Sequence, residues 1–133
     1  MGSLALIKST PVLLVEAIEP SLPFWQERLG FDRPVEVPDE GHDRLGFVIL
    51  RSGNVEVMYQ TIASLQRDVP QQAATHRGDK THLFIEAEDL DAIARSLEGF
   101  PIVLPLRKTF YGSNEIGYRE PGGHFVTFAE FKR

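Results

Sequence analysis

The sequence predicts an α+β fold in which a strand–helix–strands module occurs twice and builds one curved mixed sheet. An apolar strand at Val12–Val15 precedes a helical stretch that ends at residue 30, and a second apolar strand at 83–85 precedes one that ends at residue 99. Aligning Val15 with Ala87 gives an offset of 72 residues, so each copy fills roughly half of the 133-residue chain. Two copies are too few for a solenoid, which needs at least three units. Paired curved sheets that enclose a ligand cavity are the better interpretation.

Composition indicates a single domain over residues 1–133, with a first module at about 8–62 and a second at about 80–131. The net charge of −5, without a run of Lys or Arg, argues against nucleic acid and anionic membranes as partners. The chain has no Cys, which excludes disulfides, thiolate metal sites and a Cys nucleophile. No apolar stretch approaches the roughly 18 residues of a membrane span, and the N-terminus does not resemble a signal peptide. We therefore expect a cytoplasmic protein.

Each element of the first module has a local signal. Residues 9–16 are rich in Val and Leu and predict a strand. A helix follows that opens at Pro20 and ends at Gly30, where a C-cap needs a left-handed residue. One stripe of this helix is apolar and contains Leu22, Trp25 and Leu29. Residues 44–61 alternate around a polar turn and predict a hairpin. Residues 62–80 are the least regular part, and 71–79 within them predict a polar connection between the modules that includes a helical turn.

The second module repeats these signals. Residues 80–87 predict a strand, and Asp89 is a good N-cap for the helix that follows. The apolar positions of that helix are Leu90, Ile93, Ala94 and Leu97. Residues 101–106 predict a strand broken at Pro105, and residues 114–131 predict two strands around a Pro-Gly-Gly turn.

Strand alternation separates the side chains into two faces. The cavity face is expected to carry Thr10, Val12, Leu14, His82, Phe84, Glu86, Phe125, Thr127 and Ala129. The helix-facing side chains are Leu13, Val15, Leu83, Ile85, Val126 and Phe128. His42, His76 and His124 fall in predicted loops or turns, so we expect them to be solvated.

Three segments carry a resemblance to a known family: PFWQERLGF at 23–31, EAEDLD at 86–91 and YREPGGH at 118–124. In this order and spacing they resemble the vicinal oxygen chelate superfamily, which includes glyoxalase I, fosfomycin and bleomycin resistance proteins, and extradiol dioxygenases. The resemblance covers nearly the whole chain. It implies two βαβββ modules, paired in a homodimer so that each cavity draws on both chains.

Enzymes of this superfamily bind a divalent metal ion through His, Gln and Glu side chains. The matching positions in this chain are Thr10, Glu56, His82 and Thr127. A neutral Thr hydroxyl is a poor ligand for such ions, and a catalytic ion normally needs about three protein ligands. We therefore expect no cofactor, with His82 and Glu56 as the only candidate ligands if a divalent metal is bound. The alternative roles are a cavity-lining imidazole for His82 and, for Glu56, a carboxylate paired with a neighbouring group.

In the bleomycin-resistance branch, the loop before the last hairpin helps to form the ligand groove, and TFYGSNE at 109–115 is similar to it. Its aromatic rings, Phe110 and Tyr111, could stack on a flat ligand, or Phe110 could plug the sheet edge. The resemblance, with Thr at two of the metal positions, thus favours a metal-independent homodimer that sequesters a small aromatic or cationic molecule. The net charge of −5 and the Glu56 carboxylate favour a neutral or cationic ligand over an anion. The expected ligand-binding residues are Phe110, Tyr111, His82, Glu56, Phe84, Thr10 and Thr127. The alternative is a metal-dependent glyoxalase-like lyase or isomerase, or a dioxygenase, whose ion at His82 and Glu56 acts as a Lewis acid.

Overall fold

A computed structural model describes residues 4, 5, 7–74, 78 and 80–131 and contains two four-stranded mixed sheets. The first sheet has the order β1-β4-β3-β2 and the second the order β5-β8-β7-β6. The strands of the first sheet are β1 (Val12–Val15), β2 (Asp32–Pro38), β3 (Leu45–Ser52) and β4 (Val55–Thr61). Those of the second are β5 (His82–Glu86), β6 (Ile102–Lys108), β7 (Ser113–Arg119) and β8 (Phe125–Phe131). The repeat and the α+β class are confirmed, with the strands of each module hydrogen-bonded into a sheet of their own and not into the single curved sheet that the sequence predicts.

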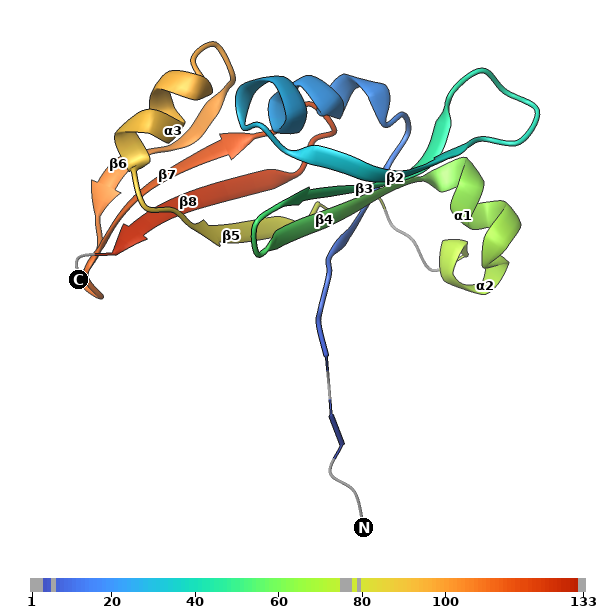
Figure 1. Ribbon diagram of the computed structural model, residues 1–133, viewed down its shortest axis with the longest axis horizontal. Coiled ribbons are helices and arrows are strands. Elements are labelled where there is room, and N and C mark those ends of the chain that lie inside the picture. Colours follow the sequence, from blue (N-terminus) through green and yellow to red (C-terminus); the bar gives the residue numbers. More distant parts are fainter. Residues whose placement is uncertain (1–3, 6, 75–77, 79, 132–133) are drawn as a thin grey trace.

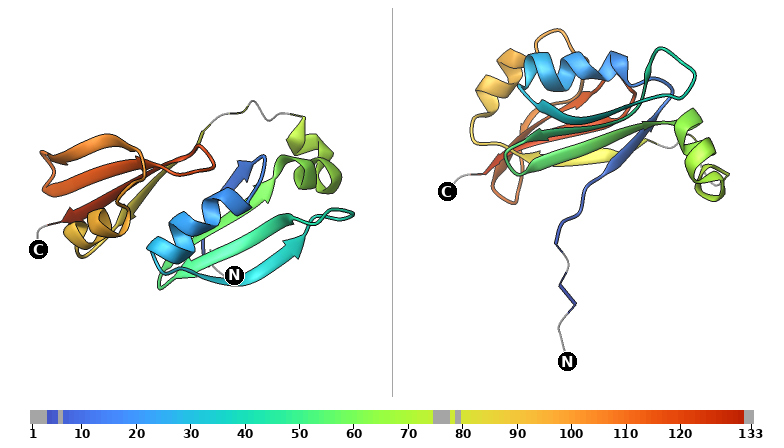
Figure 2. Two further views of the ribbon diagram at one scale, coloured as in Figure 1. Left: turned by 90° about the horizontal axis from the view of Figure 1, so that it is seen from above. Right: turned by 45° about the vertical axis from the view of Figure 1, so that its right-hand side comes forward.

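The two sheets lie side by side, and the helices that follow β1 and β5 cover the same side of both (Figures 1 and 2). We call the opposite side, which these two helical stretches leave uncovered, the open face. In both sheets the first strand pairs in parallel with the last, Val12 opposite Met58 and Phe84 opposite Thr127. The chain before β1 leaves the sheets as an extended segment (Figure 1). Among the described residues, no helix combines the length and hydrophobicity that a membrane crossing needs.

The predicted helix stripes form the core under the covered face. Trp25, Leu90 and Leu97 are buried, while Leu22, Leu29 and Ile93 are partly buried against them. The helix after β5 is α3 (Leu90–Ser96), and the Asp89 side chain accepts a hydrogen bond from the Ala92 amide, as a capping residue should. The helix after β1 is instead a 3₁₀ turn, η1 (Glu19–Ser21), followed by η2 (Pro23–Arg28) with π-type hydrogen bonding. Pro20 and Pro23 each lack an amide hydrogen, which is consistent with this interrupted ladder.

Two predictions of local structure are wrong. Residues 62–73 form the helices α1 (Ile62–Asp68) and α2 (Pro70–Ala73), where the sequence suggests a polar connection. Thr61 caps α1 by accepting from the Ser64 amide, and the buried carboxylate of Asp39 pairs with Arg67 of that helix. Strand β6 is not broken at Pro105 but runs through it. It is an edge strand, where a missing amide donor costs little, and its register shifts between Leu104 and Arg107 absorb the proline.

The two modules are joined through the turn between β7 and β8. The buried Glu120 carboxylate in this turn accepts hydrogen bonds from Ser21 Oγ and Tyr59 OH of the first module, each at 2.8 Å. His124 is buried, so its expected solvation is wrong. Its Nδ1 accepts from the Thr81 amide at 2.9 Å, which leaves Nε2 to donate to the Leu14 carbonyl oxygen, also at 2.9 Å. The docking of one module against the other therefore buries a histidine that local sequence places in an exposed turn.

Of the other two histidines, His42 is exposed as expected and His76 lies outside the described residues. A second joint lies in the helical layer, where Phe24 of η2 packs edge-to-face on Phe100 after α3, with ring centroids 5.2 Å apart. Arg28 lies over the same Phe100 ring and donates to the carbonyl oxygens of Ser96 and Glu98. The two modules thus share contacts at both the turn and the helices.

Candidate functional site

On the open face of the first module, the predicted residues Thr10 and Glu56 come together. Thr10 Oγ1 donates to Glu56 Oε1 at 2.9 Å, and the Lys8 ammonium lies 3.0 Å from the same oxygen. Arg51, opposite Glu56 on the neighbouring strand, contacts Oε2 through both Nε and a terminal guanidinium nitrogen at 2.8 Å. Glu56 is therefore a paired strand carboxylate, which is one of the two roles expected for it.

Its partners keep this carboxylate ionised. Hydrogen bonds from Lys8, then Thr10 and Arg51, lower the pKa of Glu56 from 4.5 to about 2. Two cations face one carboxylate, so the local charge does not favour a further cation at this position.

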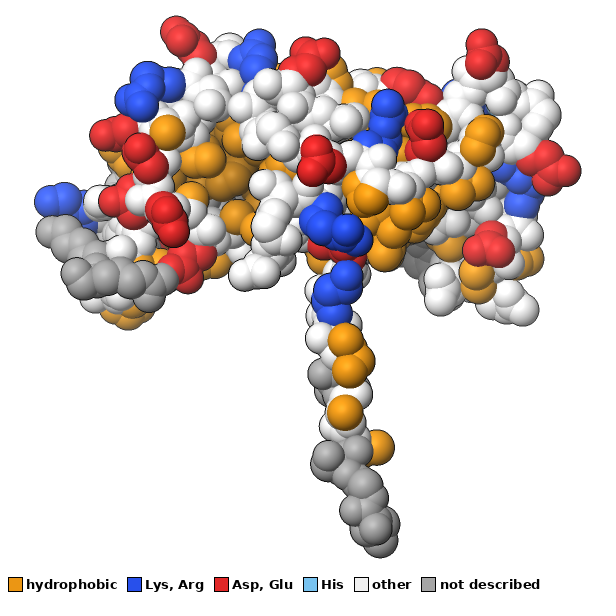
Figure 3. Space-filling model, viewed as in Figure 1, with side chains coloured by type: hydrophobic (Ala, Val, Ile, Leu, Met, Phe, Trp, Pro, Cys, Tyr) orange, Lys and Arg blue, Asp and Glu red, His pale blue; other side chains and the backbone are white. Residues whose placement is uncertain are grey.

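A groove of about 480 Å³ runs between the modules beside Glu56. Its walls are the chain before β1, the turn between β3 and β4, and strand β5. Glu56 and Phe84, two of the expected ligand-binding residues, both line it. In the space-filling view, hydrophobic side chains are visible on both modules, on either side of the extended N-terminal segment (Figure 3).

On the open face of the second module, aromatic rings form one stacked pair and a separate chain of contacts. His82 stacks on Phe125 with ring centroids 4.8 Å apart, so it is a surface imidazole on an aromatic partner. The Phe131 ring lies 6.3 Å from Phe84 and also 6.3 Å from Tyr111. Phe84 and Tyr111 remain 55% and 46% exposed, which leaves large apolar surface open to a ligand.

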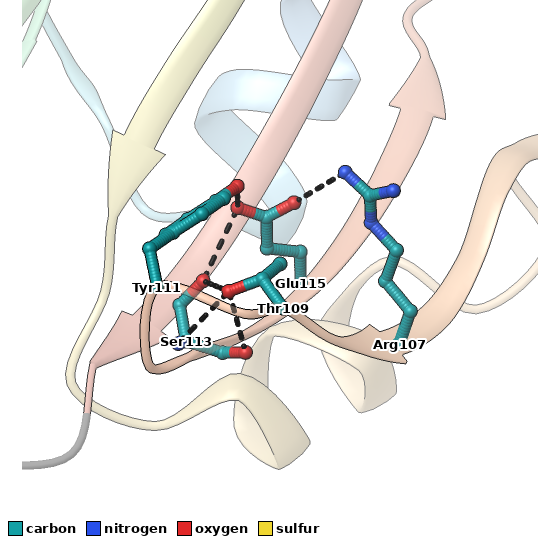
Figure 4. Close-up of polar contacts among 5 residues, drawn as sticks. All are labelled: Arg107, Thr109, Tyr111, Ser113 and Glu115. Carbon is teal, nitrogen blue, oxygen red and sulfur yellow. Dashed lines mark hydrogen bonds and ion pairs between the residues drawn. The ribbon is translucent and has the colours of Figure 1, made fainter.

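Near the end of this aromatic chain lies a buried carboxylate, Glu115 of β7 (Figure 4). Arg107 of β6 contacts Glu115 Oε1 at 3.1 Å. The Tyr111 hydroxyl donates to Oε2, and the Ser113 hydroxyl donates to the same oxygen at 3.2 Å. Figure 4 shows the carboxylate between the Tyr111 hydroxyl and the Arg107 guanidinium.

These contacts also set the protonation of both groups. Burial alone would raise the pKa of Glu115, but hydrogen bonds from Tyr111, Arg107 and Ser113 outweigh burial and hold it below its ordinary value. The hydrogen bond to Glu115 in turn raises the pKa of Tyr111. At neutral pH the pair is thus an ionised carboxylate with a phenol donor.

The remaining predicted ligand-binding residues, Phe110 and Thr127, lie apart from one another. Phe110 is fully exposed at the tip of the turn between β6 and β7, so the alternative in which it plugs the sheet edge is wrong. Thr127 lies in the middle of β8, opposite Phe84, and lines the open face. Glu115 and Arg107 are not among the site residues that the sequence predicts. One signal could have revealed Glu115, namely the alternation of side chains along β7. It places four residues on one face beside the aromatic turn: Ser113, Glu115, Gly117 and Arg119.

The strand register also bears on the metal question. Because Val12 pairs with Met58 and Phe84 pairs with Thr127, the counterpart of Thr127 in the first module is Met58. The counterpart of Glu56 is Phe125, the residue on which His82 stacks. Within the described part of the chain, no group of three or more His, Cys, Asp and Glu residues is arranged to hold a metal ion.

Known structures share this architecture at low sequence identity. TioX from Micromonospora sp. ML1 superposes with a TM-score of 0.73 at 17% identity, covering 92% of this chain and 97% of TioX. Lactoylglutathione lyase from Agrobacterium tumefaciens gives 0.71 at 16% identity, with 95% and 98% coverage. The bleomycin-binding protein from bleomycin-producing Streptomyces verticillus, solved with copper(II)-bleomycin, gives 0.66 at 21% identity, with 98% and 100% coverage.

These structures establish the fold, and their names span both a binding protein and an enzyme. Among curated proteins, no sequence matches the chain. A family model does match it, over residues 8–128, and with nearly the whole chain matched the protein belongs to the Glyoxalase/Bleomycin resistance protein/Dioxygenase superfamily.

Proposed function

We propose that this protein is a metal-independent binding protein that sequesters a small aromatic molecule, neutral or cationic, between two copies of the chain. The observation that carries the proposal is the aromatic open face of the second module, where the half-exposed rings of Phe84 and Tyr111 lie on either side of the partly buried Phe131 ring. Large exposed apolar patches on otherwise polar proteins mark binding surfaces. Sequestration needs affinity alone, so it does not depend on a metal ion.

The side chains at the positions matched to the family's metal ligands favour a binding protein over the enzymatic alternative. That alternative is a metal-dependent lyase, isomerase or dioxygenase. Thr10 and Thr127 offer neutral hydroxyls, which hold transition metals weakly. The carboxylate of Glu56 already binds Lys8 and Arg51, so a metal ion there would have to displace two cations. These residues do not fit a catalytic divalent ion.

A ligand screen tests the binding function. Bleomycin and planar cationic heteroaromatics are the first probes, because one similar structure is a bleomycin-binding protein. A ligand at a hundredfold excess over its Kd stabilises the folded state by about 2.7 kcal/mol, which a thermal melt detects. The double variant Phe110→Ala and Tyr111→Ala should lose this shift while it remains folded, with a ligand-free Tm lowered by the loss of the Tyr111 hydrogen bond to Glu115. Normal binding by the double variant would show that the turn is not part of the pocket.

Two further measurements test the absence of metal and the dimer. Elemental analysis of protein purified without chelators, before and after addition of Ni²⁺, Zn²⁺, Mn²⁺ and Fe²⁺, should give less than one metal per chain. Stoichiometric metal that is lost in His82→Ala would instead support the enzyme.

Sedimentation at micromolar concentration should give about 30 kDa, twice the 15.0 kDa chain, since two-fold dimers are the commonest assembly. A species of 15.0 kDa at every concentration would contradict the shared pocket.

A further inference from the structure

We propose that Glu115 is the anchoring carboxylate of a ligand subsite on the open face of the second module, which takes a cationic N–H donor when the Tyr111 hydroxyl moves away. The donor is an amidinium, a guanidinium or an ammonium group attached to a flat ring. This inference rests on the proposed binding function and specifies the chemical class of the ligand.

The position of Glu115 fits such a subsite. Its side chain lies on the same face as the aromatic chain, because Glu115 is directly opposite Ala129 in the β7–β8 pairing. Gly117 is the next residue of β7 on that face. A group that takes the place of the Tyr111 hydroxyl therefore meets only the small side chain of Ala129 on one strand, while Leu104 of β6, which packs over Gly117, bounds the subsite on the other side.

The two oxygens of the carboxylate have different partners. Oε1 faces the Arg107 guanidinium, whereas the donors to Oε2 are the neutral hydroxyls of Tyr111 and Ser113. A cationic nitrogen adds the attraction of two opposite charges to its hydrogen bond with a carboxylate, which a neutral hydroxyl does not supply. Exchange of the Tyr111 hydroxyl for a cationic nitrogen is therefore favourable at Oε2. Glu56 differs here, because cations contact both of its oxygens.

The group that covers Oε2 is a half-exposed side chain on an exposed turn. Tyr111 is nearly half exposed, and it stands between the fully exposed Phe110 and Gly112, whose φ of 91° is in the left-handed region. The base of the turn is closed separately, by the Thr109 amide donating to the Ser113 carbonyl oxygen at 2.8 Å. Tyr111 can thus turn outward while these base contacts stay intact. The rings of Phe131 and Phe84 then remain as a surface for the flat part of the ligand.

The test uses benzamidine as a cationic probe and benzamide as its neutral near-isostere, titrated against ¹⁵N-labelled protein by NMR. We expect benzamidine to bind about tenfold more tightly, with shifts at the Glu115 and Ala129 amides. Glu115→Gln should remove this preference. Glu98→Gln, which removes an exposed carboxylate elsewhere on the second module, should retain it. Equal affinities for the two probes, or an unchanged preference in a folded Glu115→Gln, would overturn the proposal.

Tyr111→Phe tests the subsite at Glu115 even if Glu115→Gln fails to fold. This variant keeps the ring and removes the competing hydroxyl, so it should bind benzamidine about threefold more tightly than the unmodified protein. A hydroxyl with a merely structural role would give unchanged or weaker binding, which rejects the subsite. Failure of the bleomycin screen with an intact benzamidine preference would reject the proposed function and leave the subsite. Ligand binding in the screen without a preference for benzamidine over benzamide would reject the subsite and leave the proposed function.

Discussion

Glu56 and Glu115 are both largely buried side chains on the open faces, yet their partners differ. Glu56 lies between the ammonium of Lys8 and the guanidinium of Arg51, each of which is about half exposed to solvent. Glu115 has one guanidinium, that of Arg107, and takes its other hydrogen bonds from hydroxyls. Both oxygens of Glu56 thus contact cations, whereas one oxygen of Glu115 is left to neutral donors.

The contacts of Glu56 predict a specific acid sensitivity. Because the pKa of Glu56 is lowered to about 2 from 4.5, its ionised form stabilises the folded state. That contribution is complete above pH 4.5 and is lost as the pH falls toward 2. Urea unfolding of Glu56→Gln should therefore show a weaker pH dependence than the unmodified protein in this interval.

Salt supplies the control for the Glu56 prediction. Lys8 and Arg51 are about half exposed, so high ionic strength should reduce the difference between Glu56→Gln and the unmodified protein. Parallel pH profiles for the two proteins between pH 2 and 4.5 would contradict the ion-pair role of Glu56.

At the scale of single elements, capping and edge position decide where helices and strands begin and continue. Thr61 and Asp89 both start helices by accepting an amide hydrogen three residues later. Pro105 does not end β6, because that strand has a neighbour on one side only. The same residue in a central strand would remove a ladder hydrogen bond.

The cap of α3 predicts a local stability effect. Asp89→Ala leaves the Ala92 amide without its side-chain acceptor and should lower the free energy of unfolding by about 1 kcal/mol. Asp89→Asn keeps an acceptor oxygen and should restore most of that loss in urea unfolding. A loss of equal size in both variants would mean that the charge of Asp89 matters and its capping bond does not.

At the scale of the whole molecule, one buried carboxylate joins the modules. Glu120 accepts from Ser21, Tyr59 and the Gly122 amide at Oε2, and from the His124 amide at 2.6 Å at Oε1. Tyr59 in turn accepts from Trp25 Nε1 at 2.8 Å, which extends the network into the core of the first module. Burial and the charge of Glu120 together raise the pKa of Tyr59, so its phenol remains a donor.

This joint predicts that the modules unfold together and depend on Glu120. In Glu120→Gln the side-chain amide N–H group faces hydroxyl and backbone N–H groups that are themselves donors. This variant should therefore lower the free energy of unfolding, measured in urea, by about 1–3 kcal/mol. Trp25 fluorescence and far-UV circular dichroism should give coincident transitions in the unmodified protein.

Glu27→Gln, an exposed change on η2, is the matched control and should alter stability by less than about 0.5 kcal/mol. Equal losses in Glu120→Gln and Glu27→Gln would show that the Glu120 network does not stabilise the pairing of the modules. Separate transitions for Trp25 and for the circular dichroism signal would show that the modules unfold independently.

The sequence by itself determined the tandem modules, the two faces of the strands and the cap of α3. These features depend on the spacing of apolar side chains and on contacts between residues a few positions apart, and both can be read from the amino-acid sequence. Only the tertiary structure decided the partners of the charged side chains, because each partner comes from another strand or module. Ser21 and Glu120 are 99 residues apart, and Thr10 and Glu56 are 46 apart. For the same reason local sequence placed His124 in solvent, whereas the docking of the modules buries it.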